Sequence, residues 1–425
     1  MKNIDQTGHL ALAYAQEILG TQRMILTDTT GQKDLPRYFA QVFELTKKIN
    51  AGRLDYVLPD GRVFRAEGPK PGPVAEVVVK NPDCFARLIR EGDLGFSDAY
   101  LDGWWDTPDL QALMDFVHTD NDVIYDGFPG MSLVRAYERL RHFLKGNSKR
   151  QAKKNISHHY DLGNDFYRLW LDKTMTYSSA LFETGQESLE RAQTAKYASM
   201  VDQMGVKPGD HVLEIGCGWG GFAEYAARER GLRVTGLTIS REQLAYARDR
   251  IAKANLSDMV DLKLQDYRDE RGTYDGIASI EMFEAVGEKY WPSYFETVRE
   301  RLRPGAMATL QVITVEDRRW EAYRKGVDFI QKYIFPGGML PSPTVLRAEA
   351  EKAGLVVARS IEFGQGYDQT LRRWHETFNA KWDQIAAMGF DDRFRRMWNF
   401  YLTSCASTFH VGNCDVTQIT ITRPR

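Results

Sequence analysis

Cysteine is scarce in this chain, which has 4 cysteines among 425 residues. They are scattered at Cys84, Cys217, Cys405 and Cys414, and no Cys-x-x-Cys pair or Cys/His group has the spacing of a zinc site. This scarcity excludes a disulfide scaffold. We expect no metal site and a reducing environment.

Long hydrophobic runs are also missing. No stretch approaches the roughly 20 apolar residues that a membrane-spanning helix needs. The first residues, with Asp5 and Glu17 among them, lack the cationic start and unbroken apolar core of a signal peptide. We therefore expect a cytoplasmic protein, and any contact with a membrane is expected to be peripheral.

The chain also lacks an excess of charge of one sign, because it has 56 Lys and Arg and 58 Asp and Glu, which gives a net charge of −2. This balance argues against a nucleic-acid partner. Residues 135–154 depart from it, with eight basic residues and one acidic residue. Apolar residues at helical spacing within residues 133–144 are compatible with a helix lying on an anionic lipid surface, whereas a solvated interdomain linker would show the same charge.

The length suits two domains, and 43% hydrophobic residues suffice for their cores. Residues 1–130 are expected to form a small α+β domain that begins with amphipathic helical sequence. Asp60 and Gly61 separate two strand-like runs, as in a type I′ hairpin. A further strand is expected at 74–79 and helices at 85–90 and 110–117. This region shows no catalytic constellation.

From about residue 195 the pattern alternates between strand and helix, which predicts an α/β, doubly wound Rossmann-like domain with a parallel sheet and helices on both faces. The expected strands are 211–215, 233–237, 260–264, 274–280, 306–313 and 416–422. The expected helices are 222–229, 243–253, 343–353, 370–387 and 392–406.

A glycine-rich loop, Glu-Ile-Gly-Cys-Gly-Trp-Gly-Gly at residues 214–221, follows the first of these strands and opens a helix. Gly216, Gly218 and Gly221 let the backbone approach a nucleotide ligand. About 20 residues later, Thr238 and Gln243 lie where NAD-binding proteins carry a carboxylate. With Glu214 placed to bind a cationic amino group, the constellation favours S-adenosylmethionine. A tight turn without ligand is the alternative.

Polar residues also follow the third and fourth strands, at the sheet edge where ligands of open α/β folds bind. Asp266 could accept from the exocyclic amine of adenine, with Tyr267 beside it; a merely polar strand end is the alternative. Residues 281–287 carry the carboxylates of Glu281 and Glu284 to the same edge. A helix-capping role for one of these acids is the alternative there.

Eight segments, in this order, resemble the cyclopropane fatty acid synthases and the related mycolic acid cyclopropane synthases: 158–167, 175–179, 214–221, 237–243, 265–269, 282–284, 332–337 and 363–368. Residues 94–105 extend the resemblance toward the N-terminus. The resemblance implies an N-terminal lipid-associating domain at 1–130, a basic linker at 131–155 and a class I methyltransferase domain at 156–425. It also implies a phospholipid bilayer with unsaturated acyl chains as partner, and members of the family often form homodimers.

The reaction implied by the resemblance is attack of a cis double bond on the sulfonium methyl of S-adenosylmethionine, which leaves a carbocation on the acyl chain. A bicarbonate ion then removes a proton and a cyclopropane ring closes. The resemblance gives Glu284, Ile313 and Tyr367 as bicarbonate ligands, and it places Tyr177 and Ser178 at the cofactor.

Two positions depart from the family pattern. Ser179 stands where the family has cysteine, and Gln311 where it has histidine. Both keep a hydrogen-bond donor but not a titratable imidazole. Either these are neutral changes in an ordinary cyclopropane synthase, or proton removal is redirected and the product is a methyl-branched or methylene acyl chain. A small-molecule methyltransferase and a catalytically impaired lipid- and cofactor-binding protein are the alternative functions.

Overall fold

The computed structural model describes residues 24–120 and 162–425. These residues divide into two compact units, one within 1–135 together with Arg396–Phe400, and the other within 136–395 together with Tyr401–Arg425. The helical sequence expected near the N-terminus and the basic segment at 131–155 lie outside the described residues.

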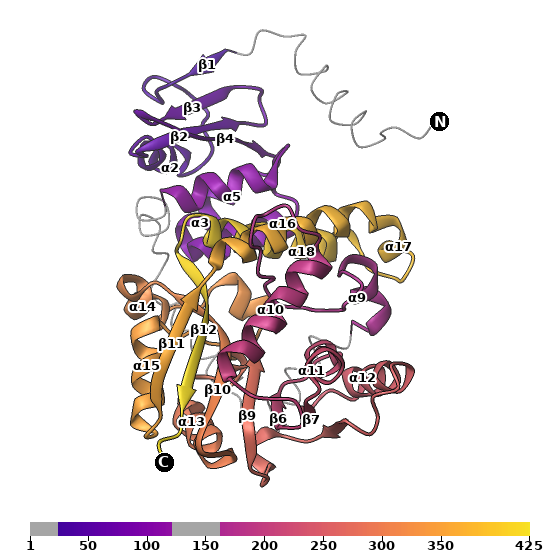
Figure 1. The fold of residues 1–425 in the computed structure, drawn as a ribbon. Coiled ribbons are helices and arrows are strands. Elements are labelled where there is room, and N and C mark those ends of the chain that lie inside the picture. The colour runs from indigo at the N-terminus through magenta and orange to yellow at the C-terminus, as the bar shows by residue number, and fades with distance from the viewer. Residues whose placement is uncertain (1–23, 121–161) are drawn as a thin grey trace. The chain divides into compact units, whose positions relative to one another are not determined.

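The first unit is built on a five-stranded sheet in the order β1-β3-β2-β4-β5 (Figure 1). Strands β2 and β3 pair antiparallel, so the predicted hairpin is confirmed. The predicted type I′ turn is wrong, because it needs a positive φ at both central residues and only Gly61, with a φ of +87°, has one. The predicted strand at 74–79 and both predicted helices are present. The strands are β1 Ile25–Leu26, β2 Ala51–Val57, β3 Val63–Glu67, β4 Lys70–Val79 and β5 Trp105–Asp106. The helices are α2 Phe39–Thr46, α3 Cys84–Glu91, α4 Asp93–Leu101 and α5 Leu110–Thr119.

The second unit contains a seven-stranded sheet in the order β11-β12-β10-β9-β6-β7-β8. Its strands are β6 His211–Ile215, β7 Arg233–Thr238, β8 Val260–Leu264, β9 Tyr274–Ile280, β10 Leu302–Val315, β11 Val356–Glu362 and β12 Cys414–Thr422. All six predicted strands are confirmed. Strand β11 was not predicted because its residues are largely exposed and form no continuous apolar run.

The expectation of a wholly parallel sheet is wrong at one strand. Strands β6 to β10 pair in parallel, but β12 runs antiparallel to both β10 and β11. Cys414, the first residue of β12, lies opposite Val315, the last residue of β10. The chain therefore enters β12 at the carboxyl edge of the sheet and can only run back along β10.

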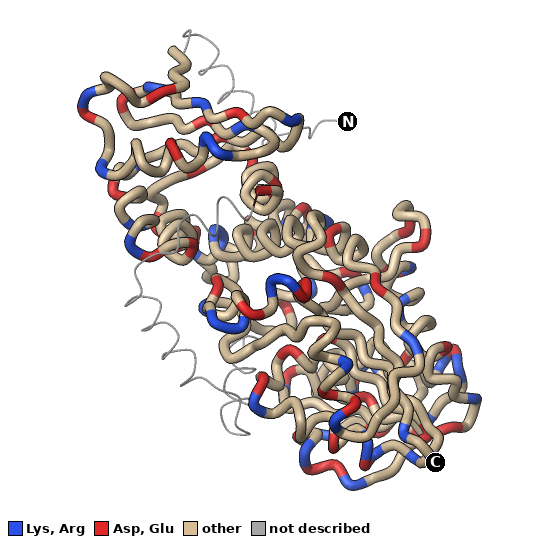
Figure 2. Tube along the Cα trace, turned by 90° about the vertical axis from the view of Figure 1, so that its left-hand side faces the viewer, with Lys and Arg blue, Asp and Glu red and all other residues tan. Residues whose placement is uncertain are grey.

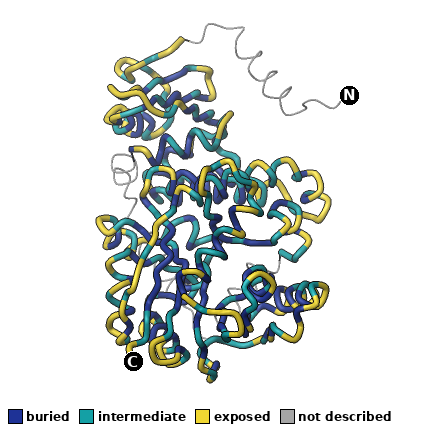
Figure 3. Tube along the Cα trace, viewed as in Figure 1, coloured by how far each residue is buried: buried dark blue, intermediate teal, exposed yellow. Residues whose placement is uncertain are grey.

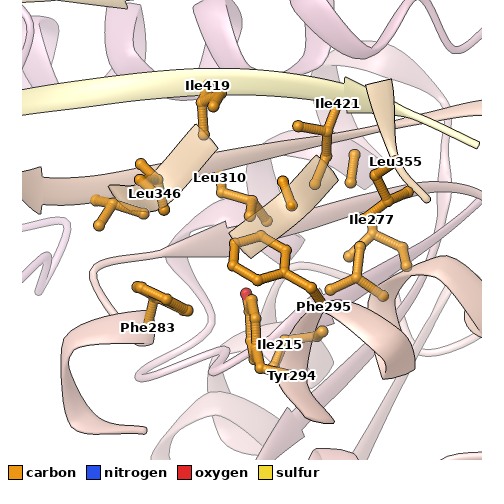
Figure 4. Packing of buried hydrophobic residues seen from close by; sticks show 14 of the residues in the cluster. Ile215, Ile277, Phe283, Tyr294, Phe295, Leu310, Leu346, Leu355, Ile419 and Ile421 are labelled. Atoms are coloured by element: carbon orange, nitrogen blue, oxygen red, sulfur yellow. The ribbon is translucent and has the colours of Figure 1, made fainter. Parts of the chain in front are cut away.

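Helices cover both faces of this sheet, as predicted. Helices α13 and α15 pack on one face with Ile215, Ile277 and Leu310, while α10, α11 and α12 pack on the other with Val212 and Ala278. Successive residues of a strand therefore point to opposite faces of the sheet and pack in different hydrophobic cores. Figure 4 shows Tyr294 and Phe295 of α13 against the first group, and Figure 3 shows the central strands as buried.

The remaining helices have the following bounds: α9 Asn164–Trp170, α10 Leu189–Met204, α11 Gly221–Arg230, α12 Arg241–Lys253, α13 Trp291–Arg301, α14 Asp317–Tyr323, α15 Pro343–Lys352, α16 Gly364–Ala380, α17 Trp382–Ala386 and α18 Asp392–His410. They belong to the second unit, except for Arg396–Phe400 of α18. Shorter helical segments lie at Tyr267–Asp269, Phe283–Ala285, Glu288–Tyr290 and Ile330–Ile334. The single helix expected at 370–387 is two helices, α16 and α17.

Charges of both signs are interspersed along the described chain (Figure 2). No helix in the ranges 24–120 and 162–425 is long and apolar enough to cross a membrane.

Candidate functional site

The predicted site residues follow or end parallel strands, whose carboxyl ends share one edge of the sheet. Gly216 follows β6, Thr238 ends β7, Asp266 follows β8, and Glu284 follows β9. Gln311 and Ile313 lie near the carboxyl end of β10. This edge is the usual ligand-binding edge of an open α/β sheet.

The glycine-rich loop needs its glycines. Gly216 and Gly218 have φ values of +86° and +50°, which side-chain-bearing residues rarely adopt. A Cβ on Gly221 would lie 2.5 Å from the Tyr197 hydroxyl, and one on Gly216 would lie 2.8 Å from Met282 Cγ. At Gly218 no heavy atom lies within 4 Å of that position. The loop is thus packed at its base and open at Gly218, as a loop that binds a ligand through its backbone requires.

Glu214 lies under this loop and is 3% exposed. Its Oε2 is buried without a hydrogen-bond partner. Burial raises the pKa of Glu214 to about 8, and the positive charges of Arg250 and Lys196 oppose this rise. A buried carboxyl oxygen without a partner is unfavourable. The arrangement fits the ammonium group of S-adenosylmethionine, which would supply the missing partner.

The other predicted cofactor residues are held in local contacts. Thr238 Oγ1 donates to Gln243 Oε1 at 3.0 Å, which ties β7 to the start of α12. Both carboxylate oxygens of Asp266 accept from the Arg268 guanidinium, at 2.8 and 2.6 Å. The Tyr267 hydroxyl is buried without a hydrogen-bond partner. Contact of these residues with the cofactor stays a prediction.

Tyr177 and Ser178 face different surroundings. The hydroxyls of Tyr177 and Tyr401 lie 2.7 Å apart. Ser178 Oγ accepts from Nζ of Lys196, a fully buried lysine on α10. Burial lowers the pKa of Lys196 to about 7, and the negative charge of Glu281, first among its acidic neighbours, opposes this fall. Lys196 was not predicted, because its helix was not.

Three of the five predicted catalytic residues surround Glu281. The Ser179 backbone N–H and Gln311 Nε2 both donate to Glu281 Oε1, each at 2.8 Å. The Tyr367 side chain also hydrogen-bonds to the Glu281 carboxylate. The Ser179 hydroxyl donates instead to the Ala180 carbonyl at 3.2 Å.

Glu284 and Ile313 are the remaining pair, and the structure brings them together. The Ile313 backbone N–H donates to Glu284 Oε1 at 2.5 Å, while Glu284 Oε2 is buried without a partner. Burial raises the pKa of Glu284 to about 8, and the negative charge of Glu281 adds to the rise. Glu284 is therefore mostly protonated at neutral pH.

The described donors do not fit a bicarbonate ion. The Ser179 N–H and the Gln311 amide, both at positions that the resemblance assigns to bicarbonate binding, already bond to Glu281. Sequence reasoning placed Glu281 at this edge but not within the site. The only signal available was its place directly after the fourth predicted strand.

Aromatic rings enclose Tyr177. Its ring centroid lies 5.3 Å from that of Trp374, 5.6 Å from Trp170 and 5.5 Å from Tyr167. The face of such a ring attracts a cation by about 0.5–2 kcal/mol per contact. The enclosure is suited to a ligand that carries a positive charge and an apolar chain.

This fold and site define a class I methyltransferase that depends on S-adenosylmethionine. The chain matches the mycolic acid cyclopropane synthetase family over residues 147–419 and belongs to it. It is 37% identical over 380 residues to the tuberculostearic acid methyltransferase UfaA1 of Mycobacterium tuberculosis, covering 87% of this chain and 88% of that protein. It is 36% identical to the cyclopropane-fatty-acyl-phospholipid synthase of Escherichia coli, covering 82% and 88%.

Solved structures agree. The cyclopropane synthase MmaA2 from Mycobacterium tuberculosis superposes with a TM-score of 0.60 at 32% identity, covering 63% of this chain and 97% of that one. Mycolic acid cyclopropane synthase CmaA1, solved with S-adenosylhomocysteine, gives 0.60 at 31% identity with the same coverage. These structures support S-adenosylmethionine as the cofactor.

We predict that Glu214→Gln weakens S-adenosylmethionine binding about 10- to 100-fold, because a charge-assisted hydrogen bond to the amino group is lost. Isothermal titration would measure the dissociation constant. Glu229→Gln, which neutralises an exposed carboxylate on α11, serves as the matched control and should bind normally. Wild-type affinity in Glu214→Gln would contradict the assignment.

A second prediction concerns pH and stability. Glu284 has a pKa of about 8 in the folded chain against an ordinary value of 4.5, so the folded state binds the extra proton and stability falls as pH rises from 4.5 to 8. Glu284→Gln removes this dependence. Relative to wild type, its free energy of unfolding should gain about 1–3 kcal/mol between pH 5 and pH 8.

Urea denaturation at the two pH values would measure this gain. Glu296→Gln, at an exposed position on α13, is the control and should follow the wild-type dependence. A Glu284→Gln curve parallel to wild type would refute the raised pKa.

Proposed function

We propose that this enzyme transfers a methyl group from S-adenosylmethionine to the cis double bond of unsaturated acyl chains in membrane phospholipids. The observation that carries the proposal is a carboxylate, Glu281, held by Ser179, Gln311 and Tyr367 at the edge that bears the cofactor loop. The names of the relatives, which are fatty acid methyltransferases and an acyl-phospholipid synthase, support this substrate class.

The charged residues and the aromatic residues of the site have different roles in this reaction. S-adenosylmethionine supplies an electrophilic methyl group on sulfur. Glu214 binds the amino group of the cofactor, and the glycine loop admits it by its backbone. The aromatic rings around Tyr177 exclude water and stabilise positive charge on the acyl chain. An alkene carries no proton that must leave before it attacks, so a base is needed only after methyl transfer.

We further propose that the product is a methyl-branched or methylene acyl chain without a ring. Ser179 and Gln311 differ from the residues found in ring-forming relatives, and the donors do not fit bicarbonate. Loss of a proton from a chain carbon beside the cation leaves a methyl-branched chain with a C=C bond. A 1,2-hydride shift that moves the cation to the methylated carbon, followed by loss of a proton from the methyl group, leaves a methylene group. The name of the relative from Pseudomonas putida, a probable fatty acid methyltransferase at 32% identity, is in keeping with this outcome.

The product can be identified by incubating the enzyme with cis-unsaturated phospholipid vesicles and S-adenosylmethionine, followed by mass spectrometry of the fatty acids. We expect the mass of one methylene unit to be gained and a double bond to be retained. A ring in place of the double bond would show that Ser179 and Gln311 are tolerated changes in a cyclopropane synthase. Cofactor binding with no product would favour the impaired lipid-binding protein.

For access to acyl chains we propose peripheral attachment to the inner face of the membrane through the basic segment at 135–154. Its support is the sequence alone, eight basic residues against one acidic residue. Each Lys or Arg that lies near an anionic leaflet contributes about 1 kcal/mol to the free energy of membrane binding.

Binding to anionic vesicles should therefore weaken as salt rises from 0.1 to 1 M, where the screening length falls from about 10 to about 3 Å. Vesicle sedimentation measures the bound fraction. A variant with Lys149, Arg150, Lys153 and Lys154 changed to Gln should bind weakly at every salt concentration. A wild-type bound fraction that does not change with salt concentration would contradict electrostatic attachment.

A further inference from the structure

The Glu281 carboxylate lies at the centre of the site and is held by donors alone. The Ser179 backbone N–H and Gln311 Nε2 share Oε1, and the Tyr367 side chain bonds to the same carboxylate. Ser179 and Gln311 are completely buried, and Tyr367 is 6% exposed. Glu281 itself is half-buried. Donors of this kind stabilise the ionised form of the acid.

A buried row of polar side chains fixes the direction of the Gln311 amide. Gln311 Oε1 accepts from Gln418 Nε2 at 3.0 Å, and Gln418 Oε1 accepts from Ser199 Oγ and Gln203 Nε2, both at 2.6 Å. Rotating the Gln311 amide by half a turn would bring its oxygen against the Glu281 carboxylate and two amide NH₂ groups against each other. The row therefore keeps Gln311 as a donor to Glu281.

The backbone at Glu281 adds an independent observation. Its φ is +47°, in the left-handed region that disfavours residues with a Cβ, and its N–H donates to the Gln311 carbonyl at 2.8 Å. Unfavourable backbone of this kind persists only where the surroundings impose it, and it gathers at functional sites. Glycine would suit this position better, so the side chain is retained at a cost to stability.

The neighbouring charges set Glu281 apart from Glu284. Burial raises the pKa of both acids, and at Glu281 the positive charge of Lys196 and the three donors oppose this rise. At Glu284 the negative charge of Glu281 adds to the rise in pKa, and only the backbone N–H groups of Ile313 and of Glu284 itself oppose it. Of these two nearby carboxyl groups, Glu281 has the surroundings that favour the ionised form more strongly.

We propose that Glu281 is the general base that removes the proton from the methylated acyl chain, so that the enzyme needs no bicarbonate ion. This rests on the proposed function. A C–H bond beside the cationic carbon breaks, its electron pair forms the new C=C bond, and the proton passes to the Glu281 carboxylate. Release of that proton to water returns the base to its starting state.

The test compares two substitutions of Glu281 in the full chain, with phospholipid vesicles, S-adenosylmethionine and buffers freed of carbon dioxide. Glu281→Gly removes the carboxylate, relieves the backbone and leaves room between the Ser179 and Gln311 donors. Glu281→Gln also removes the charge but keeps the space filled. Asn255→Gly, at an exposed position with a φ of +56°, controls for replacing a left-handed residue by glycine.

We expect wild type and Asn255→Gly to work equally well with and without sodium bicarbonate. Both Glu281 variants should lose at least about 100-fold in turnover, the usual contribution of a general base. Sodium bicarbonate or sodium formate should raise the turnover of Glu281→Gly by 10-fold or more and leave the turnover of Glu281→Gln unchanged.

Two results would overturn the assignment of Glu281 while leaving the proposed function intact. One is wild-type turnover that falls when bicarbonate is removed and returns when it is added, a measurement that needs no variant. The other is near-normal turnover of Glu281→Gln. Failure of the wild type to methylate any acyl chain would instead overturn the proposed function and this proposal together.

Discussion

Burial of charge at the carboxyl edge of the sheet is the constraint on which this site depends. Lys196 is fully buried, and the charges of Glu281, Asp172 and Glu214 act on it from three different segments. Separating any of these groups from water is unfavourable unless the others remain in place. Strand β6, the turn after β9 and the segment after α9 are therefore each coupled electrostatically to helix α10.

The apolar layers on either side of the sheet provide the stability that this burial requires. Helices α13 and α15 cover one face and α10, α11 and α12 the other, with side chains such as Phe295 and Met200 fully buried. The sheet can then hold partly satisfied polar atoms at its edge. Glu214 Oε2 and Glu284 Oε2 are two such atoms.

Sequence patterns predicted the parts of the fold that alternate cleanly between apolar strands and amphipathic helices. Strands β6 to β10 are short apolar runs bounded by turns, and the glycine loop is recognisable by its own spacing. Helix α10 was missed because its buried face carries Gln193, Lys196 and Gln203, which hide the apolar periodicity. Strand β11 was missed because it is an exposed edge strand, and the reversal of β12 depends on where α18 ends.

The sequence likewise predicted some residues of the site but not how they are arranged. Motif resemblance found Ser179, Gln311 and Tyr367, but not that Glu281 accepts hydrogen bonds from all three residues. That arrangement depends on a left-handed backbone at Glu281 and on the row of glutamines behind Gln311, and neither follows from local sequence. Our proposal that the chain supplies its own carboxylate, Glu281, would account for both departures from the family pattern that the resemblance implies, at Ser179 and Gln311.

A crystal structure of the wild-type chain with S-adenosylhomocysteine, grown in bicarbonate buffer, would show which anion the Ser179 and Gln311 donors bind. We expect the Ser179 N–H and the Gln311 amide to bond to the Glu281 carboxylate there too. A planar anion between those donors, with Glu281 turned away, would contradict that expectation.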